Sequence, residues 1–377
     1  MLARMPPARD PASADSRPVA TRKIWRIARA GSLSRLRLIE EPLPPPAAGE
    51  VQVAVQAVGL NFADVFACLG LYSATPRGAF VPGLESAGVV TAVGPGETRW
   101  RPGDTVMVLT RFGGYATALN ASRDTLWPMP SGWDYAAAAA YPVQALTAWY
   151  GLVALGGARR DAVVLVQSAV GGVGLQALAA LRSLGARPVA IVGREDKRRF
   201  LIERHGLPPA AVLLRDRHYA ASLDAALAHY GAPGFDLVFD AVYGAAFTPA
   251  FERLAPEGRY VLYGAAEFMD TGARPNPLRL AWRYLRRPRP DPLAMISVNR
   301  GLLAFNLIWL WGEVQRLPAA MRSTLELIPE PPHVGAAFAF DDALQAMRVL
   351  QAGGTTDRKS TRLNSSHVSE SRMPSSA

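Results

Sequence analysis

The hydrophobic pattern of the chain changes character at about residue 137. Beyond this point, Ala- and Leu-rich segments of helical length alternate with short apolar runs, which lie at residues 163–167, 189–192, 211–214, 236–240, 259–263 and 303–309. Continuous apolar runs separated by helices are typical of βαβ units, whose strands are buried on both faces of a parallel sheet. The pattern therefore predicts an α/β domain built on a doubly wound parallel sheet.

The N-terminal side has the pattern of a smaller β domain. Residues 51–55 alternate apolar and polar side chains with the period of a half-buried strand. Turn signals recur through residues 78–132, at Pro82-Gly83, Pro95-Gly96, Pro102-Gly103, Gly113-Gly114 and Ser131-Gly132. Short strands between such turns predict a compact domain of the β-barrel type. After about residue 318 the chain returns to short mixed elements, with a helix expected at 342–352.

The most specific motif lies at residues 163–174. A β-branched strand enters a glycine-rich turn, and a helix-forming stretch at 175–184 follows at once. This is the layout of a dinucleotide-binding turn of the Rossmann type, in which free backbone N–H groups at the helix N-terminus hold a pyrophosphate. One glycine lets the backbone approach the phosphates, and another lets the helix pack closely on the strand. The candidate cofactor-binding residues are Ala169, which replaces the first glycine of the usual motif, Gly171, Gly172, Val173 and Gly174.

The end of the second apolar run predicts which dinucleotide is bound. NAD-binding folds place a carboxylate at about this position to hold the ribose 2′-hydroxyl. This chain has Gly193 there, followed by Arg194 and, one turn later, by Lys197 and Arg198. A carboxylate would repel a 2′-phosphate, whereas guanidinium and ammonium groups pair with it. The sequence therefore favours NADPH over NADH, and the alternative is a solvated helix start without a ligand.

Composition narrows the class of protein. The chain has 377 residues, half of them hydrophobic, which predicts a globular protein of two domains. Its single cysteine, Cys68, excludes a disulfide framework and a zinc site built from cysteines. The five histidines have no metal-ligand spacing, so no metal site is expected. This cysteine usage fits a cytoplasmic protein.

The formal net charge of +10 is concentrated in two segments. Residues 1–30 carry seven Arg or Lys against two Asp, and residues 270–290 carry six Arg against one Asp, so each segment contributes +5. A charge confined to two short segments, without a recognisable nucleic-acid motif, argues against a nucleic-acid partner. Within residues 274–290, arginines alternate with Leu, Trp and Tyr. Such a segment could lie on an anionic membrane surface, although the sequence favours a solvated basic loop.

Three segments differ in composition from the rest of the chain. Residues 1–22 are rich in Pro and mixed charges and are expected to form a flexible leader. Residues 357–377 are Ser-rich and aperiodic, and are expected to be an appended, non-native tail. Residues 135–158 carry no charge and are long enough to cross a bilayer. Pro142 and a glycine cluster within this stretch favour instead a buried helix that leads into the nucleotide domain.

Several short motifs together resemble the medium-chain dehydrogenase/reductase superfamily, and specifically its zinc-free quinone oxidoreductase branch. They are Asn61-Phe62-Ala63-Asp64, Gly70-Leu71-Tyr72, the run 82–88, Gly103-Asp104, Gly113-Gly114-Tyr115-Ala116 and the run 168–174. Residues 291–307 are similar to the synaptic-vesicle membrane protein VAT-1-like group. The resemblance covers about residues 23–356. It implies a GroES-like catalytic domain at 23–140 and 318–356, a Rossmann nucleotide domain at 141–317, and a homodimer through the sixth strand.

The sequence departs from this superfamily in three ways. Zinc enzymes of the superfamily carry a cysteine in the region of Asn61 and a His-Glu pair at Leu84-Glu85, so the resemblance implies no catalytic zinc. Bacterial quinone reductases often have Tyr and Arg where this chain has Phe66 and Cys68, which leaves fewer polar groups near the substrate. Finally, relatives continue beyond position 356 into a last strand, which is expected to be missing here and to leave an exposed sheet edge.

The resemblance implies hydride transfer from NADPH to an electron-poor acceptor, namely a quinone or an enone. It places Asn61, Asp64 and Tyr72 at the nicotinamide end, and either Tyr72 or Asn61 is expected to bind the developing oxyanion. Alternatively, Tyr72 is a satisfied tyrosine of the barrel core, and Asp64 holds a backbone turn. For Glu85 and Asp240 a structural role is favoured. Further residues expected near the nicotinamide or the phosphates are Thr147, Tyr263, Gly264 and Asn306, the last on a strand.

Two other functions remain open at this point. One is a membrane-peripheral, lipid-handling protein with weak reductase activity, which the basic and aromatic segment 274–290 would serve. The other is an enoyl-thioester reductase, which turnover of an acyl-CoA would distinguish from a quinone reductase.

Overall fold

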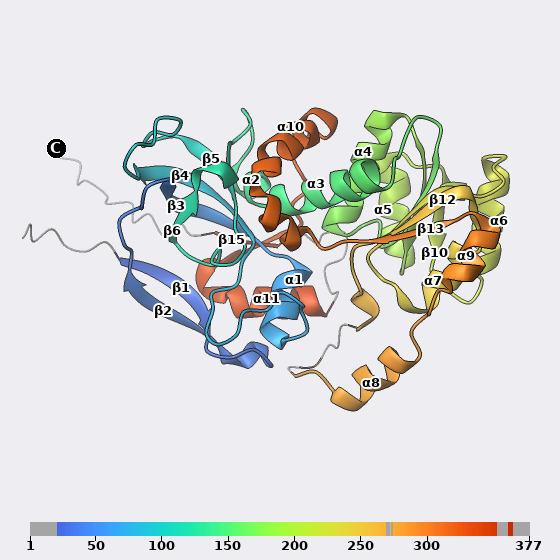
Figure 1. The fold of residues 1–377 in the computed structure, drawn as a ribbon, viewed down its shortest axis with the longest axis horizontal. Coiled ribbons are helices and arrows are strands. Elements are labelled where there is room, and N and C mark those ends of the chain that lie inside the picture. Colours follow the sequence, from blue (N-terminus) through green and yellow to red (C-terminus); the bar gives the residue numbers. More distant parts are fainter. Residues whose placement is uncertain (1–20, 269–271, 273, 353–360, 365–377) are drawn as a thin grey trace, which may run out of the picture.

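Two β-sheets, one in each of two domains, organise the chain (Figure 1). The computed structural model describes residues 21–268, 272, 274–352 and 361–364. The leader expected at 1–22 therefore lies almost wholly outside the described residues, and strand β1 already begins at Thr21. Most of the tail expected at 357–377 also lies outside them.

The nucleotide domain is a six-stranded parallel sheet in the order β10-β9-β8-β11-β12-β13. Its strands are β8 (Val163–Val166), β9 (Arg187–Val192), β10 (Val212–Leu214), β11 (Phe235–Asp240), β12 (Leu254–Leu262) and β13 (Gly301–Ala304). The helices are α4 (Gly172–Leu184), α5 (Glu195–His205), α6 (Tyr219–His229) and α7 (Phe247–Phe251). The predicted doubly wound fold is confirmed.

The apolar strands are continuous because both faces of this sheet are covered. In β8, Val164 and Val166 pack in one cluster with α3 (Pro142–Trp149) and α4. The alternate residues Val163 and Leu165 pack in another cluster with α6 and α7. Successive side chains of a strand point to opposite faces of the sheet, and here each face is covered by an apolar layer.

The last strand of this sheet was predicted at 303–309. The observed strand, β13 (Gly301–Ala304), is shorter and begins two residues earlier. The chain leaves β13 after Ala304 and enters a 3₁₀ segment, η7 (Leu307–Arg316). The side chain of Asn306 caps this segment by accepting a hydrogen bond from the N–H of Ile308 at 3.4 Å. The prediction that Asn306 lies on a strand is therefore wrong, because an apolar run does not distinguish a strand from a helical turn.

The barrel-type domain contains a seven-stranded sheet and a separate pair of strands. The pair is β1 (Thr21–Ile27) with β2 (Leu36–Pro42). The larger sheet has the order β14-β15-β3-β4-β5-β7, with β6 also paired to β3. Its strands are β3 (Glu50–Gly59), β4 (Glu85–Val93), β5 (Thr105–Leu109), β6 (Ala118–Ser122), β7 (Leu126–Pro128), β14 (Ala336–Ala339) and β15 (Thr361–Asn364).

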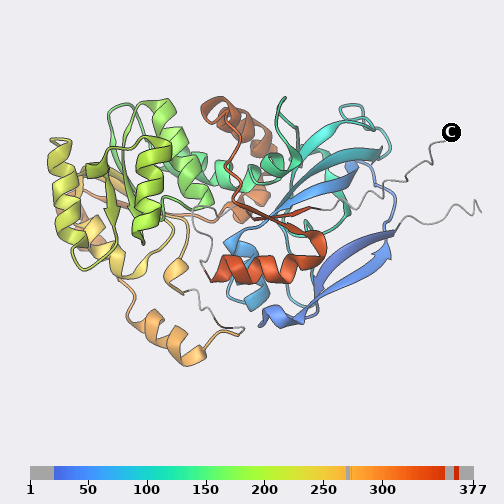
Figure 2. The same cartoon turned by 180° about the vertical axis from the view of Figure 1, so that it is seen from behind.

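Both ends of the described chain contribute to this domain. Helix α11 (Ala343–Gln351), in place of the predicted 342–352, lies beside α1 (Phe62–Leu69), as seen from behind in Figure 2. The buried residues Met347 and Leu350 of α11 join the same hydrophobic core as β3. The C-terminal segment thus completes a core that the N-terminal segment begins.

Residues 361–364 correct an expectation from the sequence. They form β15, which pairs antiparallel with β3, from Arg362 opposite Gly59 to Asn364 opposite Ala57, and parallel with β14. The expectation that a final strand is missing is therefore wrong. Four residues of the predicted tail supply the strand, because backbone pairing does not require a hydrophobic pattern that marks the segment in the sequence.

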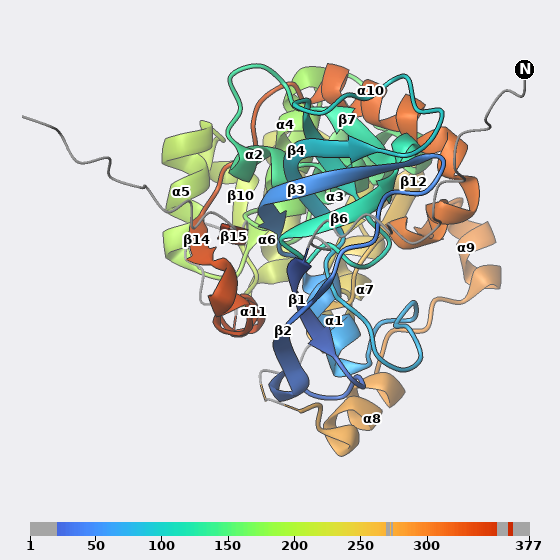
Figure 3. The same cartoon turned by 90° about the vertical axis from the view of Figure 1, so that its left-hand side faces the viewer.

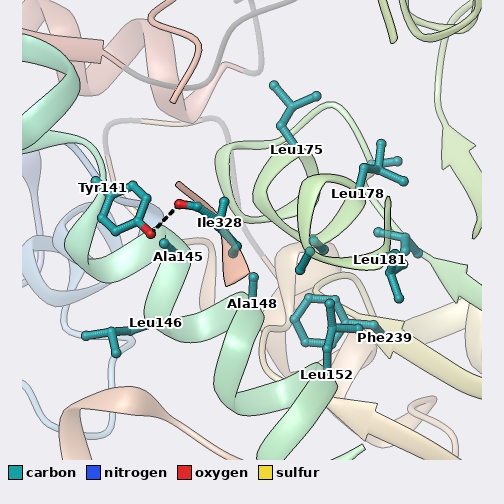
Figure 4. Close-up of a cluster of buried hydrophobic side chains, with 14 of the residues drawn as sticks. Tyr141, Ala145, Leu146, Ala148, Leu152, Leu175, Leu178, Leu181, Phe239 and Ile328 are labelled. Carbon is teal, nitrogen blue, oxygen red and sulfur yellow. Dashed lines mark hydrogen bonds between the residues drawn. The ribbon is translucent and has the colours of Figure 1, made fainter. Parts of the chain in front are cut away.

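The uncharged stretch 135–158 is helical and lies at the seam between the domains. It forms α2 (Tyr135–Ala139), α3 and a π-helical turn, η3 (Tyr150–Leu155). Beside α3 lies α10 (Leu317–Leu327), and the Tyr141 hydroxyl donates to the carbonyl of Ile328 just beyond α10 at 2.7 Å (Figure 4). In the described part of the chain, no helix has both the length and the apolar character needed to cross a membrane.

Candidate functional site

A cavity of about 510 Å³ lies where the two domains meet. From the nucleotide domain, it is lined by the segments that follow the carboxyl ends of β8, β11, β12 and β13. From the barrel domain, it is lined by residues 60–63 at the start of α1 and by the loop at 71–73 after α1. Ligands of open α/β sheets bind at this carboxyl edge, so the cavity is the candidate site. Most of its lining is apolar.

The glycine-rich turn forms one wall of the cavity. Gly171 is the N-cap of α4, and no side chain caps the first turn of this helix. A Cβ at position 174 would lie 2.5 Å from the carbonyl oxygen of Ser168, and one at position 172 would overlap the Gln144 side chain. Gly174 thus allows the close helix–strand approach predicted from the sequence. Gly171, Gly172, Val173 and Gly174 all line the cavity.

Two residues at the start of this turn differ from the sequence prediction in whether they line the cavity. Ala169 is buried, with its N–H donating to the carbonyl of Ile191 at 3.0 Å, and it is not among the lining residues. Ser168 does line the cavity and has a positive φ of 54°, which is uncommon for a residue with a side chain. No role was predicted for Ser168, although its place at the start of the glycine-rich turn is a usable signal.

The basic residues predicted for a 2′-phosphate lie after β9, outside the cavity lining. A Cβ at Gly193 would meet nothing within 4 Å, so this position is open. Arg194 makes two hydrogen bonds of 3.1 Å to Asp196, which lower the pKa of that carboxyl. Lys197 lies one turn into α5 and is half-buried.

Two further arginines lie near Gly193, and the structure changes the interpretation of both. Arg198, one of the predicted cations, donates to the carbonyls of Val212 and Pro209 and is therefore engaged by the backbone. Arg215 was not predicted. Its N–H donates to the carbonyl of Val192 at 2.9 Å, which places this exposed residue beside Gly193 at the edge of the sheet. A cation directly after the third strand is the signal that could have found it.

Tyr72 and Asn306 form a polar pair in the otherwise apolar cavity. The Tyr72 hydroxyl donates to Asn306 Oδ1 at 2.7 Å, and both residues line the cavity. Burial raises the pKa of Tyr72 to about 12, so the hydroxyl keeps its proton at neutral pH. The pair joins residues that are 234 positions apart, and brings one side chain from each domain to the same point.

Asn61 also lines the cavity and is held by two buried carboxyl groups. Its side-chain amide donates to Glu85 Oε1 at 2.8 Å, and its backbone N–H donates to Asp64 Oδ2 at 2.8 Å. The other oxygen of Glu85 accepts from the N–H of Val143 at 2.8 Å. These contacts agree with the structural role favoured for Glu85.

Asp64 does not line the cavity. Its carboxyl group is 1% exposed and accepts hydrogen bonds from three donors, namely the N–H of Asn61, the N–H of Gly83 and the hydroxyl of Tyr115. A carboxylate surrounded in this way fixes the loop that precedes α1. Of the two roles considered for Asp64, the geometry favours the one that holds the backbone.

The remaining predicted residues are brought together at the cavity. Thr147 donates its hydroxyl to the carbonyl of Val143 at 2.6 Å, as a threonine in a helix commonly does. Tyr263 stacks on Phe239 with ring centroids 4.2 Å apart, and Gly264 follows it. Thr147, Tyr263 and Gly264 are all lining residues. Asp240 instead accepts hydrogen bonds at the end of β11, from the N–H of Val242, the N–H of Tyr243 and the hydroxyl of Tyr260.

Among the residues that the structure describes, no group of three or more His, Cys, Asp or Glu side chains is arranged to hold a metal ion.

Comparison with known proteins identifies the family. Residues 47–143 match the alcohol dehydrogenase GroES-like domain, and residues 172–284 match the domain described as zinc-binding dehydrogenase. The synaptic vesicle membrane protein VAT-1 homolog of Rattus norvegicus is 32% identical over 326 residues, which are 85% of this chain and 79% of that protein. The chain belongs to the medium-chain dehydrogenase/reductase superfamily. Within it, the chain falls in the zinc-free quinone oxidoreductase branch and its VAT-1-like group.

Solved structures of the superfamily agree with this assignment. A mycobacterial quinone oxidoreductase is 26% identical with a TM-score of 0.72, and the match covers 91% of this chain and all of that one. A mycobacterial protein in complex with NADPH is 25% identical with a TM-score of 0.77, again over 91% of this chain and 100% of the other. The two-domain α/β fold predicted from the sequence is thus that of the superfamily.

The buried acids behind Asn61 make stability depend on pH. Burial raises the pKa of Glu85 to about 8 and that of Asp64 to about 7, above their ordinary values of 4.5 and 3.8. At a pH between the ordinary and the raised pKa of such a group, the folded state binds more protons than the unfolded state. The free energy of unfolding therefore falls as pH rises from about 5 to about 8.

We expect Glu85→Gln to remove the part of this slope that Glu85 contributes, at most about 1.4 kcal/mol per pH unit. Urea unfolding at a series of pH values measures it, with Glu203→Gln on the exposed side of α5 as the control. A Glu85→Gln protein that keeps the full wild-type slope would contradict the assignment.

Proposed function

We propose that this protein is an NADPH-dependent, zinc-independent reductase that transfers hydride to a quinone or an enone. The observation that carries the proposal is one continuous cavity. It joins the N-terminus of α4, which suits phosphates, to apolar walls whose polar groups include the Tyr72–Asn306 pair. An apolar pocket with few convergent polar groups suits a flat, electron-poor acceptor.

The residues of the cavity fit a dinucleotide. The first turn of α4 offers backbone N–H groups without a side-chain cap, and the turn at Gly171 and Gly172 has no side chains that would keep a pyrophosphate away. Thr147, Tyr263, Gly264 and Asn306 would surround the nicotinamide end. The NADPH complex of the mycobacterial neighbour supports a nucleotide in this position.

The residues after β9 support a preference for NADPH. Gly193 leaves open space and carries no carboxylate that would repel a 2′-phosphate. Lys197 and Arg194 would supply the positive charge. Arg194 would then exchange part of its pairing with Asp196 for the phosphate, at a surface position where an ion pair is weak.

When bound, NADPH supplies a hydride to the acceptor. The protein's own contribution is to exclude water, to orient the acceptor between apolar walls, and to donate a hydrogen bond where negative charge develops on the acceptor oxygen. Tyr72 is suited to this because its raised pKa keeps it a donor. The single O–H of Tyr72 is donated to Asn306 Oδ1, so it would turn from Asn306 to the acceptor oxygen when the acceptor binds, and the Asn61 amide is fixed by Glu85 close to the same cavity.

The cofactor assignment predicts a difference between the two nicotinamide nucleotides. In a fluorescence titration, wild-type protein should bind NADPH more tightly than NADH. Lys197→Ala should weaken NADPH binding about 10- to 100-fold and leave NADH binding nearly unchanged, because one charge-assisted contact to the 2′-phosphate is lost.

Arg204→Ala, near the other end of α5, is the matched control and should change neither affinity. A quinone added afterwards should oxidise the bound NADPH, whereas oxidation by an α,β-unsaturated acyl-CoA instead would indicate an enoyl-thioester reductase. Failure of the wild-type protein to bind either nucleotide would refute the reductase proposal.

The role of Tyr72 predicts a loss of rate without a loss of cofactor. Tyr72→Phe should lower kcat about 100-fold, the usual effect of removing one donor to an oxyanion, while the dissociation constant of NADPH stays within about twofold. Tyr135→Phe, a half-buried tyrosine outside the cavity, is the control. A kcat within about threefold of wild type would exclude Tyr72 as the donor.

We also propose a homodimer through β13. This strand is the last in its sheet, and its outer edge has no partner within the described chain. The helix before it, α9 (Pro292–Val298), exposes Leu293 and Ile296. Light scattering should give twice the chain mass of 40.4 kDa, and Leu293→Asp with Ile296→Asp should give a monomer. A wild-type monomer at micromolar concentration would contradict this proposal.

A further inference from the structure

Gln144 is a buried polar side chain in the wall of the cavity, and the sequence analysis did not predict it as a site residue. It lies in the first turn of α3, is only 3% exposed, and lines the cavity. Within the described residues, its side-chain amide has no hydrogen-bond partner. A buried amide that is left unpaired costs free energy, because it has lost its contacts with water. The amide is therefore available to a ligand of the cavity.

The other buried polar side chains of the cavity already have partners. The Asn61 amide donates to Glu85, and the Thr147 hydroxyl donates to the carbonyl of Val143. These contacts hold Asn61 and Thr147 within the protein itself. Of the buried polar residues that line the cavity in the described part of the chain, Gln144 alone keeps its side-chain donor and acceptor groups free.

The Gln144 amide lies against the first turn of α4. Helix α3 packs beside α4 where it passes from the barrel domain to the nucleotide domain (Figures 1 and 3). A Cβ at position 172 would lie 2.6 Å from Gln144 Nε2, so the amide fills the space beside the Cα of Gly172. Gly172 is the first residue of α4, whose first turn has no side-chain cap. The free amide and the free N–H groups of α4 therefore share one corner of the cavity.

The position of Gln144 is fixed by its neighbours in α3. The N–H of Val143 donates to the buried Glu85 carboxyl group at 2.8 Å, which anchors the start of the helix. Ala145 and Leu146, the next two residues, are buried in the hydrophobic core. Gln144 is therefore presented to the cavity from a rigid turn, as a residue that binds a ligand by a single hydrogen bond must be.

We propose that the Gln144 amide donates a hydrogen bond to the pyrophosphate of the bound dinucleotide. This inference rests on the proposed function, because it takes NADPH as the ligand. The pyrophosphate oxygens are negatively charged acceptors, so they are complementary both to the amide N–H and to the N–H groups of α4. A neutral amide is also suited to this buried position, since an unpaired cation in the same apolar wall would cost more free energy before the nucleotide binds.

The test is nucleotide binding by Gln144→Met, which keeps the length of the side chain and removes the amide. Calorimetry should show that the dissociation constants of NADPH, NADH and ADP-ribose all rise at least about tenfold, the effect of losing one hydrogen bond to a charged group. These three ligands share the pyrophosphate. Lys197→Ala, in contrast, should weaken NADPH alone. Gln144→Glu, which places a carboxylate of the same shape beside the pyrophosphate, should weaken all three ligands further.

The matched control is Gln176→Met. Gln176 is a buried glutamine of α4 whose Oε1 has no partner among the described residues, and it does not line the cavity. This variant should change none of the three dissociation constants. The melting temperature of ligand-free Gln144→Met should not fall, since the lost amide has no partner in the described chain, whereas the increase that a fixed NADPH concentration produces should be smaller than in wild type.

The ligands separate the failure of this inference from the failure of the reductase proposal. Wild-type affinities in both Gln144 variants would overturn the role of Gln144 and leave the reductase proposal intact. Weaker binding of NADPH and NADH with unchanged binding of ADP-ribose would also overturn it, because the amide would then contact the nicotinamide instead. A wild-type protein that binds none of the three nucleotides would overturn both proposals.

Discussion

A single buried carboxyl group ties the two halves of the site together. Glu85 begins β4 of the barrel domain, yet one of its oxygens accepts from Val143 at the start of α3, the helix that leads into the nucleotide domain. Its other oxygen fixes the side chain of Asn61 at the cavity. A Cβ at position 59 would overlap this carboxyl group, so the contact requires Gly59. The orientation of a cavity residue thus depends on the contact that also positions one domain against the other.

The two domains contribute different groups to the cavity: the nucleotide domain offers mainly backbone N–H groups, and the barrel domain offers mainly side chains. Parallel strands end together at one edge, where the helix that follows offers backbone N–H groups but few side chains. The barrel domain offers side chains on short helices and loops, such as Asn61 and Tyr72. Their meeting at the Tyr72–Asn306 hydrogen bond gives a wall for a nucleotide and a wall for an acceptor, which neither domain supplies alone.

Local patterns predicted the elements well where one physical cause dominates. The strand–turn–helix at 163–184 follows from apolar runs and from glycines that permit close backbone contact, and the structure has it, with the helix beginning at Gly172 rather than at the predicted 175. Predictions failed where contacts with residues distant in sequence, or a capping side chain, determine the local structure. Asn306 was placed on a strand, but its side chain caps η7. Strand β15 is paired with β3 and β14, both distant in sequence, and its own sequence does not reveal these partners.

The apolar stripes of this chain show most clearly what a sequence leaves undetermined. Helix α4, with Leu175, Leu178 and Leu181, and α8 (Pro277–Leu285), with Leu278, Trp282 and Leu285, each carry an apolar stripe along one helix face. The first is buried against the sheet, whereas the second faces outward, although both have the periodicity of an amphipathic helix. The flanking residues differ, since arginines border the stripe of α8, and a buried stripe could not accommodate them without partners. Charge beside an apolar face, rather than the face itself, is therefore the sequence signal that separates the core helix α4 from the exposed helix α8.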